Sequence, residues 1–140
     1  MHLVLAVHPE DDRAWVAEAT ADFALKTGAT VAVVCVDEVE LERLAPVPRS
    51  VYAARAAAAA SAAAERLTAA GVPATSSVRA GLARDQILAF AEQEGADVVV
   101  VGASGRPAVA TRLLGSTPLA VVARSNRPVL VVTRPSETSA

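Results

Sequence analysis

The sequence predicts an α/β fold in which helices cover both faces of a doubly wound parallel sheet. Short valine-rich runs alternate with longer helical segments along the 140 residues of the chain, and this alternation indicates strands and helices in turn. Glycine, proline and acidic residues mark the boundaries between the segments. Strands that are separated by helices are joined by crossover connections, which make them parallel. We therefore expect a single domain at 1–134, followed by a flexible polar tail at 135–140.

The first strand is expected at 2–7, where the residues are apolar and partly β-branched. A proline soon follows and cannot continue a central ladder. Acidic residues at 10–12 suit the positive end of a helix, which is expected to run to about Lys26. Gly28 is expected to end this helix, because glycine readily adopts the left-handed backbone conformation found after helix C-termini. The buried face of this helix is predicted from residues at helical spacing, which are Val16, Ala19 and Phe23.

The second strand is expected at 30–36 and contains Cys35, the only cysteine of the chain. We interpret this thiol as a small buried side chain rather than a redox centre. Residues 37–49 carry two prolines and predict a connecting loop. A helix is expected at 50–70, because twelve of the nineteen residues at 52–70 are alanine, the strongest helix former. Such a helix contributes little buried area per residue.

The third strand, at 73–79, is more polar than the others, which places it at an edge of the sheet. A helix follows at about 85–94. Its apolar residues Ile87, Phe90 and Ala91 recur at helical spacing, so we expect them to face the core. A glycine then closes the helix.

Four consecutive valines at 98–101 indicate a strand that is buried on both faces, as in a parallel sheet. A short helix is expected at 118–124 and the last strand at 129–133. The loop between the valine strand and the short helix is far longer than the two to six residues typical of α/β units. Long loops in compact domains are usually functional or disordered. Since doubly wound sheets bind ligands beyond the carboxyl ends of their strands, this loop is the candidate site.

The composition of this loop suits a phosphate group. Its glycines are Gly102, Gly105 and Gly115. Glycines let backbone N–H groups approach an anion without a Cβ in the way. Ser116 and Thr117 add hydroxyls near the start of a helix, where N–H groups are unpaired, while Arg106 and Arg112 add positive charge. The alternative is that each glycine serves only a tight turn, and the loop matches neither the Walker motif nor the dinucleotide motif.

The pattern G-x2-G-x9-G-S at 102–116 resembles the ATP-binding signature of the universal stress protein family. The resemblance extends over nearly all of 2–133, including the lead-in at 96–102 and the closing segment at 127–132. It implies a Rossmann-like three-layer αβα sandwich with a five-stranded parallel sheet in the order 3-2-1-4-5. It also implies an adenine nucleotide ligand (ATP, AMP or ADP), for which Mg2+ is an optional companion, and a homodimer through the last strand, Val129 to Thr133.

The resemblance further implies which residues contact the nucleotide. The loop would contact the phosphates and ribose, and the ends of the first two strands would frame the adenine. The expected contact residues are Ala6, Val7, His8, Val36, Val101, Gly102, Gly105, Arg106, Gly115, Ser116 and Thr117. Two positions depart from the family pattern. His8 stands where nucleotide-binding members usually have an aspartate, and Pro118, which lacks an N–H, stands where many have a hydroxyl.

The role of His8 stays open at this level. Its imidazole could stack on a base or hydrogen-bond to it, it could hold a metal together with the acids at 10–12, or it could simply follow the strand. Helix capping alone explains those acids. His2 is interpreted as incidental.

Composition argues against other classes of function. The formal charge of −2 and the 3% aromatic content supply neither a basic surface nor stacking platforms for nucleic acid. No apolar run reaches the ~18–20 residues of a membrane span, and no basic leader with a cleavage site precedes the first strand. A lone cysteine suits a reducing compartment, so we expect a cytoplasmic protein without membrane or nucleic-acid partners.

The sequence also lacks a catalytic constellation, because both histidines lie near the N-terminus and no Cys/His cluster suits zinc. We therefore expect a stress-response protein that acts as a sensor or regulator through a bound adenine nucleotide, with at most weak ATPase activity. The alternative is a dimeric adaptor of the same fold that has lost nucleotide binding. A true hydrolase is the third hypothesis.

Overall fold

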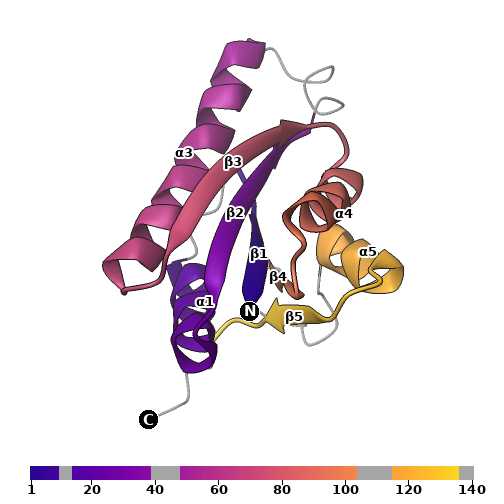
Figure 1. The fold of residues 1–140 in the computed structure, drawn as a ribbon. Helices are drawn as coiled ribbons and strands as arrows, with labels where there is room; N and C mark the ends of the chain where they lie inside the picture. Colours follow the sequence, from indigo (N-terminus) through magenta and orange to yellow (C-terminus); the bar gives the residue numbers. More distant parts are fainter. Residues whose placement is uncertain (10–13, 39–47, 104–114, 136–140) are drawn as a thin grey trace.

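The computed structural model describes residues 1–9, 14–38, 48–103 and 115–135. The elements, in chain order, are β1 (His2–Val7), α1 (Ala14–Thr27), β2 (Thr30–Asp37), α3 (Arg49–Ala69), β3 (Ala74–Ala80), α4 (Ala83–Glu94), β4 (Val98–Gly102), α5 (Ser116–Arg124) and β5 (Val129–Val132) (Figure 1). The tail expected at 135–140 lies almost wholly outside the described residues. No helix in the described ranges has both the length and the apolar character needed to span a bilayer.

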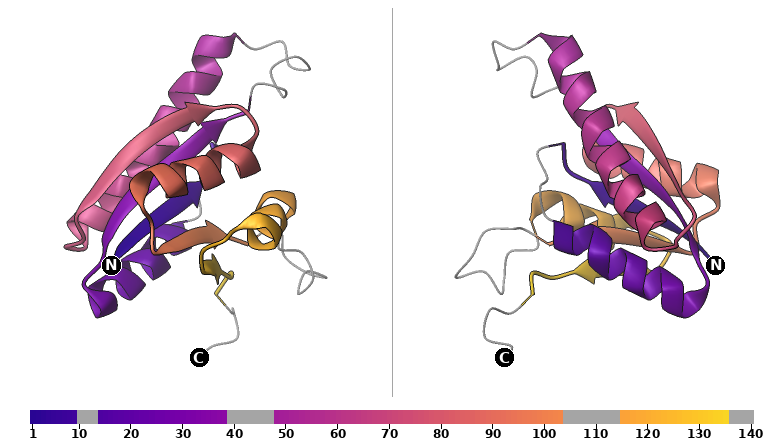
Figure 2. Two further views of the ribbon diagram at one scale, coloured as in Figure 1. Left: turned by 45° about the vertical axis from the view of Figure 1, so that its right-hand side comes forward. Right: turned by 90° about the vertical axis from the view of Figure 1, so that its left-hand side faces the viewer.

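The strands form one five-stranded parallel sheet in the order β3-β2-β1-β4-β5, which confirms the predicted order. Two helices pack on each face, α1 and α3 on one and α4 and α5 on the other, so the molecule has three layers (Figure 2). The polar strand β3 lies at one edge, as its composition predicts, and β5 lies at the other.

Alternate residues of the central strands enter two separate cores. Leu3 and Leu5 of β1 join the core under α1 and α3, whereas Val4 between them joins the core under α4 and α5. Cys35 is fully buried in the first of these cores, which confirms it as a buried side chain. Both faces of the sheet are covered, which is why the central strands read as continuous apolar runs.

The buried face of α1 differs from the predicted stripe. Val16 is buried and Phe23 is half-buried, but Ala19 is exposed. The remaining buried residues are Ala17, Thr20, Ala21 and Ala24. The apolar pattern does not predict that Thr20 is buried, because this residue is polar. Its hydroxyl donates to the Val16 carbonyl at 2.8 Å, so the helix can turn this residue inward without leaving a polar group unpaired.

Helix α3 packs through alanine methyl groups, as its composition predicts. Its buried residues are Ala56, Ala60, Ala63, Ala64 and Leu67. These residues bring the helix against β2 and β3 and against α1. A methyl group removes little apolar area from water. Among the described side chains of this helix, Leu67 is the one large side chain that is fully buried in the core.

The helix boundaries differ from the sequence expectation mainly at their starts. Helix α4 begins at Ala83, two residues before Asp85, and closes at Gly95 in the left-handed conformation, with φ 61° and ψ 40°. Helix α5 begins at Ser116 rather than at Pro118. Proline fits inside the first turn of a helix because its missing N–H has no partner there. The residue therefore stands inside the helix rather than opening it.

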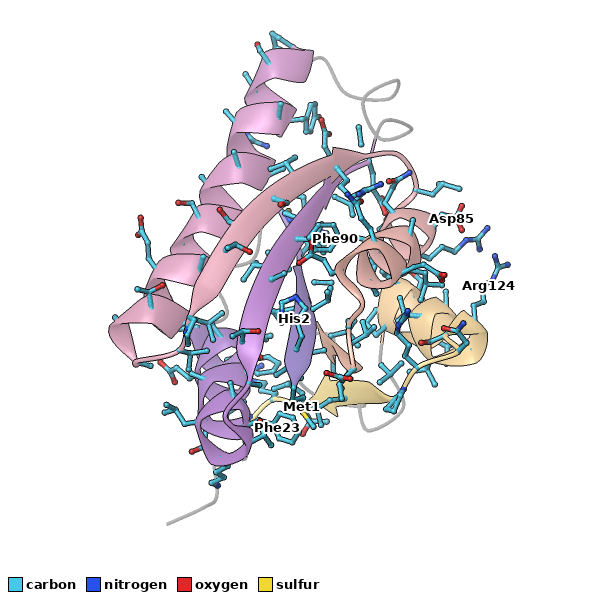
Figure 3. All side chains as sticks on the ribbon, viewed as in Figure 1. Met1, His2, Phe23, Asp85, Phe90 and Arg124 are labelled. Carbon is cyan, nitrogen blue, oxygen red and sulfur yellow. The ribbon has the colours of Figure 1, made fainter. Side chains whose placement is uncertain are left out.

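His2 is not incidental, and the sequence interpretation of this residue is wrong. Its backbone N–H donates to Asp97 Oδ2 at 2.7 Å, and its carbonyl accepts the Asp97 N–H at 2.7 Å. Its imidazole lies 2.7 Å from the Thr30 hydroxyl and 3.1 Å from Glu94 Oε1 (Figure 3). Since Glu94 is the last residue of α4, the ring joins the start of β1 to β2 and to α4. We call His2, Thr30, Glu94 and Asp97 together the amino-edge clasp.

Candidate functional site

The carboxyl ends of β1, β2 and β4 lie side by side in the sheet. In the strand register Val7 lies opposite Cys35, Ala6 lies opposite Val101, and Gly102 lies opposite Val132. His8 follows β1 directly at this edge and is exposed. The structure thus brings together six of the predicted contact residues, which are Ala6, Val7, His8, Val36, Val101 and Gly102. Ligand sites of doubly wound sheets form at this edge.

The end of β2 holds an acid that the sequence analysis assigned to a loop. Asp37 is the last residue of β2 and is only 3% exposed. Its carbonyl accepts the Gly81 N–H at 3.1 Å, and the carboxylate of the next residue, Glu38, accepts the Ala83 N–H at 3.3 Å. These bonds tie the end of β2 to the start of α4. The end of the apolar run at 30–36 already predicts that Asp37 lies at this edge, and the structure adds that this residue belongs to the strand.

Helix α4 is held against β3 by a second group of contacts, which run along its length. Arg79 of β3 donates from Nε to Gln86 Oε1 at 2.9 Å and from Nη1 to Gln93 Oε1 at 2.7 Å. Its guanidinium lies 5.7 Å from the centre of the Phe90 ring. Gly81 has a φ of 137°, and a Cβ there would lie 3.0 Å from the Gln86 side chain. The turn from β3 to α4 therefore requires glycine, and it positions this side of the carboxyl edge.

The start of α5 has the features of an anion site. Gly115 stands at its N-cap with φ 93° and ψ 156°, a conformation that is essentially restricted to glycine, and it offers no capping side chain. The Leu119 N–H is satisfied by the Gly115 carbonyl at 3.2 Å, and Pro118 has no N–H. The N–H groups of Ser116 and Thr117, which lack partners within the helix, remain with their two hydroxyls to bind an anion.

Part of the predicted site cannot be placed. Gly105 and Arg106 lie outside the described residues, as does Arg112. Among the residues that are described, no group of three histidine, cysteine or acidic side chains could hold a metal ion. The metal alternative for His8 depends on the acids at 10–12, which also lie outside the described ranges.

Comparison with known proteins agrees with this architecture. The model of the "Universal stress protein family" matches residues 1–133. The chain belongs to the universal stress protein family. Among curated members, universal stress protein G of Shigella flexneri is 51% identical over 55 residues, which are 39% of this chain and 38% of the relative. The chain thus matches well under half the length of that relative.

Two solved universal stress proteins resemble the whole fold. The protein from Archaeoglobus fulgidus in complex with dAMP superimposes with a TM-score of 0.73 at 24% identity, covering 94% of this chain and 97% of that one. A universal stress protein in complex with cAMP superimposes with a TM-score of 0.70 at 25% identity, covering 95% and 96% of the two chains. At this level of identity the first likeness establishes the fold alone.

Proposed function

We propose that this universal stress protein binds an adenine nucleotide at the carboxyl edge of its sheet and acts in the cytoplasm as a stress-response sensor or regulator. The observation that carries the proposal is the start of α5, where Gly115 adopts a glycine-only conformation directly before two hydroxyl residues. An uncapped helix N-terminus attracts phosphate through its N–H groups and its dipole. The ends of β1 and β2 then frame the base, with His8 exposed beside them.

Two further facts support the ligand class. Solved members of the same fold carry dAMP and cAMP, and both are adenine nucleotides. The glycine pattern at 102–116 has the spacing of the ATP-binding signature, although residues 104–114 lie outside the described ranges. ATP, ADP and AMP are therefore the ligands to test, each with and without Mg2+.

Titration calorimetry with ATP and AMP tests the proposal, with Gly115→Ala as the informative variant. The substituted residue strains the backbone by about 1–3 kcal/mol and displaces the first turn of α5, so we expect at least about tenfold weaker binding. Gly95→Ala is the matched control, because Gly95 also has a positive φ but ends α4 at the opposite edge. No heat with either nucleotide at millimolar concentration contradicts the proposal, and so does equal weakening by the two substitutions.

The proposed partner is a second copy of the chain, paired through β5. The sheet edge formed by Val129, Leu130 and Val131 is apolar, contains no proline or charge, and is only half-buried. The other edge, β3, carries serines and Arg79 instead. Apolar, unprotected edges are templates for strand pairing. Sedimentation at tens of micromolar should show a dimer, and a monodisperse monomer contradicts this assignment.

The second candidate function is a dimeric adaptor of the same fold without a nucleotide. His8 and Pro118 favour it, because each replaces a residue that nucleotide-binding members usually carry. Mass spectrometry of small molecules released from the purified protein separates the two functions. A stoichiometric adenine nucleotide excludes the adaptor, whereas its absence together with silent calorimetry supports it. In either case we expect at most weak ATPase turnover, and a slow rate that Gly115→Val leaves unchanged indicates contamination.

A further inference from the structure

Helix α5 is thinly anchored within its own chain. It has nine residues, and Val121 is its one fully buried side chain, while Thr117, Pro118 and Ala120 are half-buried. Besides the packing of Val121 into the core that α4 also covers, α5 is joined to α4 by an ion pair in which Arg124 Nη1 lies 4.0 Å from Asp85 Oδ1. Both of these charged side chains are largely exposed (Figure 3). Isolated helices shorter than about 12 residues are marginal in water. The position of α5 therefore depends on what packs around it.

One flank of α5 is exposed and apolar. Each residue turns a helix by about 100°, so with Val121 facing the sheet, Arg124 faces one side and Val122 the other. Arg124 reaches α4, which packs over β1 and β2, whereas α5 packs over the edge strand β5. Val122 therefore faces outward beyond that edge. Leu119 lies about 60° further round the helix than Val122, on the side turned away from the sheet. Leu119 is 58% exposed and Val122 is 43% exposed. We call these two residues the outer flank of α5.

The charges around the outer flank suit a second copy of this chain as its occupant. In a dimer with two-fold symmetry each group near the axis meets its own copy, so a charge there repels its counterpart. Strand β5 carries no charged residue. Two nearby arginines are directed to partners in this chain: the largely exposed Arg124 lies 4.0 Å from Asp85 on α4, and Arg127 Nε donates to the Ala96 carbonyl at 3.0 Å. The outer flank and β5 are themselves apolar and uncharged, as a self-complementary contact requires, and Arg124 and the exposed Arg134 lie at their borders.

We infer that α5 links nucleotide binding to self-association, so that each favours the other. This inference rests on the proposed function. The nucleotide would hold the first turn of α5 at Ser116 and Thr117, and the second copy would pack on the outer flank of the same short helix. The nucleotide and the second copy each hold α5 in place. Whichever binds first therefore reduces the conformational entropy that is lost when the other binds. The coupling is reciprocal by thermodynamic necessity.

Sedimentation velocity over a dilution series, with and without saturating ATP, measures the coupling. We expect ATP to lower the dimer dissociation constant by about fivefold or more. Calorimetry at protein concentrations above and below that constant should show tighter ATP binding by the dimer. The expected change is about twofold per site, the square root of the factor on dimerisation, because a dimer holds two sites. Binding of ATP with an unchanged monomer–dimer equilibrium overturns the inference and leaves the proposed function intact. Absence of binding with both ATP and AMP instead refutes the proposed function.

Two variants separate the outer flank from general surface effects. Val122→Arg places a charge against its own copy, so it should raise the dimer dissociation constant at least about tenfold and weaken ATP binding. Leu25→Arg is the control, because Leu25 of α1 is 56% exposed and lies on the other face of the sheet. It should change neither quantity. A Val122→Arg protein that stays folded by circular dichroism and dimerises like the control overturns the inference.

Discussion

Replacement of Gly81 by alanine should destabilise the protein by an amount that the structure allows us to work out. With φ at 137°, this residue lies in a region that is essentially restricted to glycine, and a side chain there strains the backbone by about 1–3 kcal/mol. The new Cβ would also lie 3.0 Å from Gln86 Nε2 and 3.2 Å from Gln86 Cγ. The amide of Gln86 must move, which weakens its bond to Arg79, worth about 1.5 kcal/mol. We expect a total loss of about 3 kcal/mol.

Urea denaturation measures this loss as a shift of the midpoint at constant slope. Gly95→Ala is the matched control, because Gly95 has a φ of 61° and a Cβ there meets nothing within 4 Å. It should cost only about 1 kcal/mol. The double variant Gly81→Ala with Gln86→Ala should recover the steric part of the loss. Equal destabilisation by Gly81→Ala and Gly95→Ala would falsify the reasoning.

Three further predictions concern the core, the amino-edge clasp and the anion site. Leu67→Ala should cost about 2–5 kcal/mol in urea denaturation, whereas the exposed Leu25→Ala should stay within about 0.5 kcal/mol. His2→Ala should cost about 1 kcal/mol, and the loss should be smaller in a Glu94→Ala background, since the two side chains share one contact; additive losses refute the clasp. Thr117→Val should weaken ATP binding about three- to tenfold in calorimetry without lowering stability.

The strand pattern could be predicted from sequence because both faces of a parallel sheet are covered. Valine runs such as 98–101 are typical of a strand that is covered on both faces, and the helices between the strands require crossover connections. The polar composition of β3 likewise predicted its edge position. The buried face of α1 could not be predicted in full, because Thr20 satisfies its own hydroxyl within the helix and behaves there as a buried side chain.

One part of the candidate site could be predicted because its residues follow strand ends. His8 and Gly102 reach the carboxyl edge simply because parallel strands end together. The sequence likewise predicts Asp37 at this edge, but as the first residue of a loop, because an acid after an apolar run is typical of a loop; the structure makes it the last residue of β2. The clasp at His2 could not be predicted. Its partners Glu94 and Asp97 are more than 90 residues away, and no local pattern predicts a contact at that separation.

The reactivity of Cys35 toward a thiol reagent reports on opening of the sheet. The chain has one cysteine, and that residue is fully buried in β2 between two neighbouring strands. A thiol reagent can reach this sulfur only when the sheet opens, so the labelling rate measures the opening equilibrium without any introduced probe. Conversely, a cysteine added at an exposed position is the one reactive thiol of the native protein. A fluorophore can therefore be attached selectively to a cysteine introduced beside the outer flank of α5 or at the amino-edge clasp, and Cys35 does not have to be replaced first.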